Sequence, residues 1–226
     1  MVFPLIVLLL FSSSSSKGDG GKLLSYTIGQ PVCSKRYLPK SIQIIVRGIA
    51  RLIGEDENGE FTIAKLNQGA IIGLSSLLNT ESCEEVSAST ELVTFSVDDE
   101  QIISLYETDA NFRTNCNKYL QVNDIYFISS LIKSKSSNTK LTSGKLIISL
   151  LGKISLRTVS NQITLKDDNK KSWFLSSNNV IDQKRGEKIR YNEVIQASGN
   201  LPVRLLGIEK AVLSELLNSR DVLCEE

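Results

Sequence analysis

The chain of 226 residues has no histidine, and its four cysteines, at positions 33, 83, 116 and 224, are far apart with no CxxC pair. The missing histidine excludes Ser-His-Asp and Cys-His nucleophile chemistry and removes the commonest metal ligand. The cysteine spacing fits neither a zinc site nor a dense disulfide framework, so we expect buried or incidental thiols. The sequence therefore predicts a protein without catalytic residues, metal site or cofactor.

A basic excess is also missing, because the formal net charge is only +1. Proteins that bind nucleic acid usually carry a strong positive charge, so we expect no nucleic-acid partner. The charge is nevertheless unevenly spread: residues 51–100 hold eleven acidic and two basic side chains, a net charge of −9. Such a segment repels anions, and we interpret it as a solvated acidic face.

No run of about 20 apolar residues is present, as a membrane-spanning helix would need. The opening "MVFPLIVLLLF" has ten apolar residues after Met1, which rise only about 15 Å as a helix. We interpret residues 1–21 as an apolar and serine-rich leader. The alternative is a signal peptide over residues 1–16, although no Lys or Arg precedes the apolar run. It would make the chain a secreted or periplasmic β-rich binding protein.

Strand-like sequence fills the next segment. "SIQIIVRGIARLIGEDENGEFTIAKL" is rich in Ile and Val and is broken by an Asn-Gly turn signal. It predicts strands near 42–47, 49–55 and 60–66, of which the last two form a hairpin. "EEVSASTELVTFSV" adds one or two strands.

The apolar period changes near Val97 from two to spacings of three and four. This change predicts a short helix and then a long one, interrupted near Asn123 and Asp124. Asp98 or Ser96 and Thr108 or Asp109 are the candidate N-caps. The apolar stripe on the long helix is suited either to docking on a partner or to packing within the chain.

Polar residues at 136–145 predict a linker, and residues 146–226 read as a small β-rich unit with a terminal helix, "IEKAVLSELLNSRD". "LIISLLGKISLRTV", "QITLKDD", "SWFLSS" and "VIQASGNLPVRLLGI" are its expected strands. Trp173 and Phe174 are expected in its core. For Arg204 we favour a surface position in which its stem covers the core, with a buried anchor as the alternative.

The segments "VRGIARLI", "LNQGAIIGLSSLL" and "SASTELVTFSVDDEQIISLYETDANF", in this order, resemble the cyclic-nucleotide-binding domain family. The resemblance covers about half of the chain. The fold class implied is mainly β with α, a jelly-roll-like cyclic-nucleotide-binding-type β-roll with C-terminal helices over residues 22–135. Gly69 permits a tight turn, and Gly73 permits close approach of the backbone to a ligand.

The ligand cassette departs from the family pattern. Leu74 stands where the family has a glutamate for the ribose 2′-hydroxyl, and Ser82 stands where its arginine pairs with the cyclic phosphate. Cys83 and Glu84 follow Ser82. The resemblance therefore implies a degenerate pocket for which cAMP and cGMP are not expected ligands. The pocket-equivalent positions are Gly69, Ile72, Gly73, Leu74, Ser75, Ser82 and Cys83.

A closer resemblance covers nearly the whole chain. "YTIGQPV", "ARLIG", "LNQGAIIGLSSLL", "CEEVSASTE" and "WFLSS…LPVRLLGI" look like the cytoplasmic N-terminal region of bacterial peptidase-containing ABC exporters. It implies a cytoplasmic, sensor-like regulatory module whose partner is an ABC exporter or its peptidase domain. A further alternative is a CRP-like transcription regulator, but the strand-like sequence after residue 135 offers no recognisable helix-turn-helix.

Overall fold

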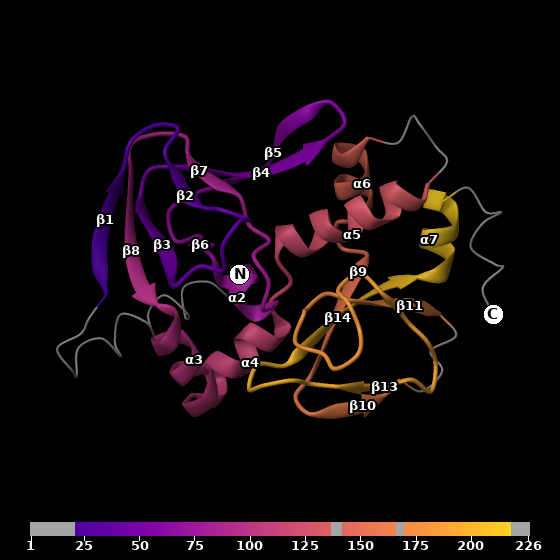
Figure 1. Cartoon of the computed structure of the whole chain (residues 1–226). Coiled ribbons are helices and arrows are strands. Elements are labelled where there is room, and N and C mark those ends of the chain that lie inside the picture. Colours follow the sequence, from indigo (N-terminus) through magenta and orange to yellow (C-terminus); the bar gives the residue numbers. More distant parts are fainter. Residues whose placement is uncertain (1–20, 137–141, 166–169, 218–226) are drawn as a thin grey trace. The chain divides into compact units, whose positions relative to one another are not determined.

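A computed structural model describes residues 21–136, 142–165 and 170–217 (Figure 1). The chain divides into two compact units, Met1–Tyr119 and Leu120–Glu226, which are described separately below. The predictions for the leader and its signal-peptide alternative, and for Cys224, lie outside the described residues. None of the described helices is long and apolar enough to cross a membrane.

Two antiparallel four-stranded sheets form the first unit. Their strand orders are β1-β8-β3-β6 and β2-β7-β4-β5. The strands are β1 (Lys22–Tyr26), β2 (Pro31–Cys33), β3 (Ser41–Arg47), β4 (Ala50–Asp56), β5 (Gly59–Leu66), β6 (Ile71–Ile72), β7 (Val86–Ala88) and β8 (Leu92–Asp98). The predicted mainly β fold with a β-roll is confirmed.

The interior of this unit follows from alternation along the strands. In β4 the side chains of Ala50 and Leu52 are buried, whereas Arg51 between them is exposed. Successive side chains of a strand point to opposite faces, so one face of each sheet supplies the core. A cluster of these residues comprises Cys33, Ile45, Ala50, Leu52, Ile72, Val86, Ala88 and Leu92.

The predicted hairpin is the β4–β5 pair, which projects beyond the neighbouring strands (Figure 1). At its tip the amide of Asn58 donates to Asp56 Oδ1 at 3.0 Å, and Gly59 has a φ of 103°. Glycine adopts positive φ without steric cost. The Asn-Gly signal in the sequence therefore marked the turn correctly.

Between residues 21 and 119 the first unit also has three helices: α2 (Leu74–Leu78), α3 (Asp99–Thr108) and α4 (Ala110–Lys118). Asp109 caps α4, because its Oδ1 accepts the Phe112 amide at 2.7 Å. It is one of the two candidates, Thr108 and Asp109, that we predicted for this cap. The side chain of Asp98 makes no such bond at the start of α3. The short helix α2 was not predicted; five residues are too few for a helical period to show.

The second unit combines a four-stranded antiparallel sheet, β12-β11-β14-β9, with a two-stranded sheet, β10-β13. Trp173 and Phe174 on β11 are buried in it, as predicted. Its elements are α5 (Val122–Lys135), α6 (Ser143–Leu150), β9 (Ile154–Val159), β10 (Gln162–Thr164), β11 (Lys171–Leu175), β12 (Lys188–Ile189), β13 (Val194–Gln196), β14 (Val203–Glu209) and α7 (Lys210–Leu217).

The structure corrects one predicted strand, the predicted helix interruption and one domain boundary. Asn123 and Asp124 lie within α5, and the helices are interrupted at residues 119–121 instead. Residues 146–150, read as strand, belong to helix α6, since a short apolar run has no period that separates helix from strand. Thr142 begins this helix by accepting the Lys145 amide at 3.4 Å, inside the stretch 136–145 that we interpreted as a linker. Residues 137–141 of that stretch lie outside the described residues. Helix α5, grouped with the roll in the sequence analysis, falls in the second unit.

Arg204 is not a surface residue, contrary to the reading we favoured. Its side chain is 1% exposed, and its Nη2 lies 3.1 Å from Oδ2 of Asp124 on α5, which is fully buried. The partners are 80 residues apart in the sequence. A charge that is removed from water needs an opposite charge nearby, and no local pattern around "LPVRLLGI" shows where that charge lies.

Candidate functional site

The cassette begins with two glycines that have different tasks. Gly69, with a φ of 83°, sits in a turn in which the Ala70 amide bonds the Asn67 carbonyl at 2.9 Å. Gly73, with a φ of 90°, is the residue before α2, and a Cβ there would lie 3.3 Å from both the Ser41 carbonyl oxygen and Ile42 Cδ1. Gly73 therefore lets the backbone of the cassette approach strand β3.

The residues after Gly73 point into the protein interior. Leu74 and Ser75 are each 1% exposed, and Ser76 is fully buried. Leu74, which we predicted to replace the family's ribose-binding glutamate, is thus part of the apolar core. A polar ligand group cannot reach it without unpacking α2.

The loop after α2 is held by Ser82 and Cys83. The Ser82 hydroxyl lies within donor distance of two carbonyl oxygens, Ser34 at 2.9 Å and Tyr37 at 2.8 Å. The Cys83 amide donates to Ser76 Oγ at 3.2 Å. Ser82, which we predicted to replace the family's arginine, therefore offers a hydroxyl that binds the backbone of the 34–37 loop.

Glu84 is the residue that joins this loop to α2. It is 3% exposed, and its Oε1 accepts the Gly73 amide at 3.1 Å. Its Oε2 accepts both the amide and the hydroxyl of Ser76, each at 2.9 Å. The first amides of a helix have no partner within the helix, and they attract negative charge. A carboxylate of the chain itself meets that need here.

The neighbouring acid, Glu85, fastens the opposite side of the loop. Its Oε2 accepts the Lys35 amide at 3.0 Å and the Ser34 hydroxyl at 3.3 Å. Lys35 in turn pairs with Glu55 at 2.8 Å on the surface. The acidic segment is thus not a uniformly solvated face: Glu84 is buried and, with Glu85, organises the cassette.

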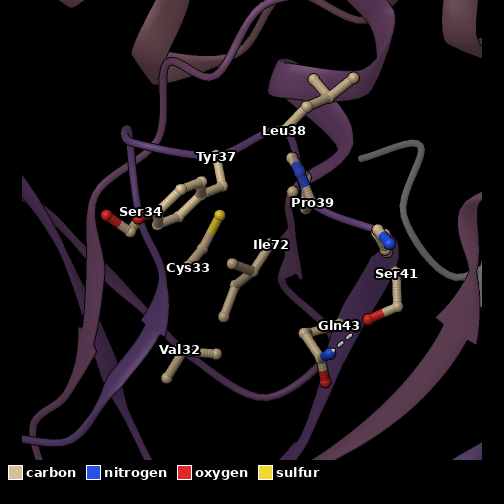
Figure 2. A pocket seen from close by; sticks show the side chains of 11 residues that line it. Val32, Cys33, Ser34, Tyr37, Leu38, Pro39, Ser41, Gln43 and Ile72 are labelled. Atoms are coloured by element: carbon tan, nitrogen blue, oxygen red, sulfur yellow. Dashed lines mark hydrogen bonds between the residues drawn. The ribbon is translucent and has the colours of Figure 1, made fainter.

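A cavity of about 280 Å³ lies beside the cassette, between the 31–40 segment and strands β3 and β6 (Figure 2). This is close to the lower end of the usual range for ligand pockets, about 300–1,000 Å³. Its lining consists of Val32, Cys33, Ser34, Tyr37, Leu38, Pro39, Lys40, Ser41, Gln43, Ile72 and Gly73. Two of the predicted pocket positions, Ile72 and Gly73, are among them.

Gln43 provides the buried polar group of this lining. Its Nε2 donates to Ser41 Oγ at 3.0 Å, the bond drawn in Figure 2, and to Ser96 Oγ at 3.1 Å. Its Oε1 accepts the Thr94 hydroxyl at 2.7 Å. The amide is therefore fixed in orientation by the strands and presents a preformed, uncharged polar surface.

The pKa of Cys33 reflects its burial and the charges near this part of the cavity wall. The pKa of this thiol is raised to about 12, mainly by burial and in addition by the nearby Glu84, Cys83 and Glu85. Glu84 and Glu85 thus place negative charge near the part of the cavity wall that Cys33 forms. A thiol with so high a pKa is protonated at neutral pH and is a poor nucleophile.

Sequence reasoning missed Cys33, Tyr37, Gln43 and Glu84 as members of this region. Gln43 left a signal, because it is the polar residue inside the apolar strand "SIQIIVR". Glu84 was placed after Ser82 and Cys83 in the cassette, but its bonds to Gly73 and Ser76 were not predicted. Within the described residues, no group of three or more Cys, Asp or Glu side chains is arranged to hold a metal ion.

Comparison with known proteins gives one family match: the cyclic nucleotide-binding domain family matches residues 23–109. A search of the curated proteins finds no match. Among solved structures, a cyclic nucleotide-binding-like protein from Brucella abortus is 23% identical, with 46% of this chain and 84% of that chain covered and a TM-score of 0.36. A cyclic nucleotide-binding domain from Methylobacillus flagellatus is 16% identical, with coverage of 49% and 69% and a TM-score of 0.38.

A cyclic nucleotide-binding protein from Geobacter metallireducens gives similar values: 16% identity, coverage of 49% and 85%, and a TM-score of 0.37. At these identities and TM-scores, the structural matches carry no conclusion about ligands. The family match and the two four-stranded sheets agree in the same segment. The segment that matches the cyclic nucleotide-binding domain family, residues 23–109, is thus the segment that forms the two four-stranded sheets.

Proposed function

We propose that this chain is a non-catalytic regulatory module in which the cyclic nucleotide-binding-type domain acts by contact with a partner and does not bind cAMP or cGMP in the usual way. The observation that carries the proposal is the cassette: Ser82 stands at the arginine position, and the Glu84 carboxylate lies on the Gly73 and Ser76 amides. The polar groups that would receive a cyclic phosphate are either missing or already bonded.

The energetic consequence is large enough to decide binding. A hydrogen bond to a charged group contributes about 1.5–3 kcal/mol net, so losing the arginine weakens binding by roughly tenfold to a hundredfold or more. Repulsion between a phosphate and the buried Glu84 carboxylate adds to this loss.

The proposed partner is an ABC exporter or its peptidase domain, and the proposed location is the cytoplasmic side of the membrane. The order of the motifs from "YTIGQPV" to "LPVRLLGI" supports this assignment. The apolar stripe of α5 is not the proposed contact, because Ile125, Ile128 and Ile132 are buried. Ile148, which is 71% exposed on α6, and Leu151, which is 52% exposed just after it, are better placed.

Calorimetry with cAMP and cGMP at low salt tests the ligand half of the proposal, because low salt leaves the acidic field least screened. We expect no binding tighter than a Kd of about 10 μM, which corresponds to roughly −7 kcal/mol. A tighter constant would contradict the proposal.

Co-purification from exporter-containing membranes tests the partner half. We expect an ABC exporter or a fragment with its peptidase domain to be recovered with the full chain, and less of it with Ile148→Ser and Leu151→Ser. Val194→Ser is the matched control, since Val194 is 51% exposed in the same unit. Failure to recover an exporter, or equal recovery with all variants, would contradict this part.

A further inference from the structure

We propose that Glu84 is the permanent occupant of the cassette: its carboxylate holds α2 in place without any ligand and excludes negatively charged ligands from the adjoining cavity. This inference deepens the proposed function, because it concerns the same cassette. It makes Glu84 the residue that determines ligand class, and the cavity is left to uncharged molecules.

Glu84 accepts hydrogen bonds from the residues at the beginning of α2. Two come from backbone amides, of Gly73 and Ser76, and one comes from the Ser76 hydroxyl, all between 2.9 and 3.1 Å. Hydrogen bonds to a carboxylate are about twice as strong as those between neutral groups. The three bonds together tie the loop before β7 to the beginning of α2.

The Gly73 and Ser76 donors to Glu84 are fixed in position. Gly73 is held against Ser41 and Ile42 on β3, and Ser76 is fully buried. The donors therefore cannot turn toward another acceptor without moving α2 out of the core. An incoming anion would have to displace Glu84, which would leave a carboxylate buried without these bonds, at high cost.

The negative charge of Glu84 also affects the cavity. Gly73, whose amide bonds Glu84, lines the cavity, as does Cys33, whose thiol feels the charge of Glu84. Negative charge thus lies behind the part of the wall that Gly73 and Cys33 form, whereas Lys40 is a cation of the same lining. The fixed amide of Gln43 and the apolar side chains of Val32 and Ile72 present surfaces that suit an uncharged molecule.

Replacement of the carboxylate tests the proposal, with thermal unfolding of the full chain as the readout. Glu84→Ala should lower the Tm of the first unit by roughly 10 °C, since charge-assisted bonds are lost from a domain of this size. Sodium formate should restore part of that loss relative to sodium chloride at equal ionic strength, because formate can occupy the vacated position. Wild type and Glu91→Ala should show no formate-specific effect; Glu91 is an exposed acid of the same unit.

Glu84→Gln is the second variant, for the case in which Glu84→Ala does not fold. It keeps the size of the side chain but removes the charge, so formate should not stabilise it. Amide hydrogen exchange at Gly73 and Ser76 should accelerate by about tenfold or more relative to wild type, which corresponds to loss of about 1.4 kcal/mol of protection. Unchanged exchange at both amides would overturn the proposal.

Two further outcomes would also overturn it: a Glu84→Ala variant as stable as Glu91→Ala, or a destabilised variant on which formate acts no better than chloride. The failure of the proposed function looks different. If wild type binds cAMP and the Gly73 and Ser76 amide resonances shift, both proposals fail. If it binds cAMP without shifting them, or if no exporter is recovered, only the proposed function fails.

Discussion

The two units each bury a carboxylate, and they satisfy it with different donors. In the first unit, Glu84 accepts bonds from two backbone amides and a hydroxyl at the beginning of α2. In the second unit, the donors to Asp124 include a cation, Arg204 of β14. Amide donors belong to the backbone and are kept by every substitution except one to proline, whereas a side-chain cation is lost in most substitutions. The first arrangement suits a cassette that must keep one shape, and the second couples a helix to a sheet.

The Asp124–Arg204 pair of the second unit also depends on more of its surroundings. Asp124 accepts the Gln121 amide at 2.9 Å and lies 3.4 Å from the Ser176 hydroxyl, in addition to its contact with Arg204. Arg204 is thus buried beside a carboxylate on α5 whose position depends on the packing of that helix. Removal of either charge leaves the other buried without its opposite charge.

The largest expected effect is therefore on the second unit. Asp124→Ala should destabilise this unit by about 3–5 kcal/mol, because it leaves the Arg204 charge buried without its carboxylate. Trp173, the only tryptophan of the chain and part of this unit, allows the loss to be followed by fluorescence during urea unfolding.

Two variants control this measurement. Glu215→Ala removes an exposed acid from the same unit and should change little. The double variant Asp124→Leu with Arg204→Met should recover much of the stability, since apolar residues of similar size often replace a buried ion pair without loss. If Asp124→Ala loses little stability, the buried ion pair of the second unit is not more sensitive to substitution than the Glu84 site of the first.

An intermediate effect is expected when the hydroxyl donor to Glu84 is removed. Ser76→Ala deletes the 2.9 Å bond to the carboxylate and the acceptor of the Cys83 amide, so it should cost about 1–3 kcal/mol. Urea unfolding followed by far-UV circular dichroism measures it. Ser75→Ala is the matched control, because Ser75 is equally buried but its contacts with Asn79 and Cys83 are 3.4 and 3.9 Å long. Equal losses of stability in Ser76→Ala and Ser75→Ala would mean that the charge of Glu84 adds nothing to the strength of the Ser76 hydrogen bond.

The smallest effect is the pH dependence that burial imposes on Cys33. Its pKa is raised from the ordinary value of 9.0 to about 12, so the folded state keeps the proton longer than the unfolded chain does. The corresponding stability is fully present below pH 9 and is lost as the pH rises toward 12, by at most about 1.4 kcal/mol per pH unit.

Unfolding measured between pH 8 and 10 checks this sign. The loss should be smaller in Cys33→Ala, and the difference between the two proteins isolates the thiol from Tyr26, whose pKa burial also raises. If Glu84→Gln reduces the pH dependence as well, the carboxylate contributes to the field at Cys33. A steeper loss in Cys33→Ala than in wild type would reverse the assigned sign.

Features that depend on near neighbours in the chain could be predicted. The hairpin of β4 and β5 follows from the Asn-Gly turn, and the cap of α4 follows from Asp109, which bonds an amide three residues away. The change from strand to helix near Val97 follows from the apolar period. The degenerate cassette also remains a prediction from the sequence, because it rests on the identities of Leu74 and Ser82.

The sequence by itself determined the β4–β5 hairpin, the change from strand to helix near Val97 and the absence of histidine chemistry, because residue type and period act over a few positions. The β-roll was implied by the resemblance to the cyclic-nucleotide-binding family. Only the tertiary structure decided which charges are buried and by what they are satisfied. Glu84 reaches amides 8 and 11 residues away, and Arg204 meets Asp124 across 80 residues. The cost of burying a charge depends on donors that folding brings together, and these donors leave no local pattern in the chain.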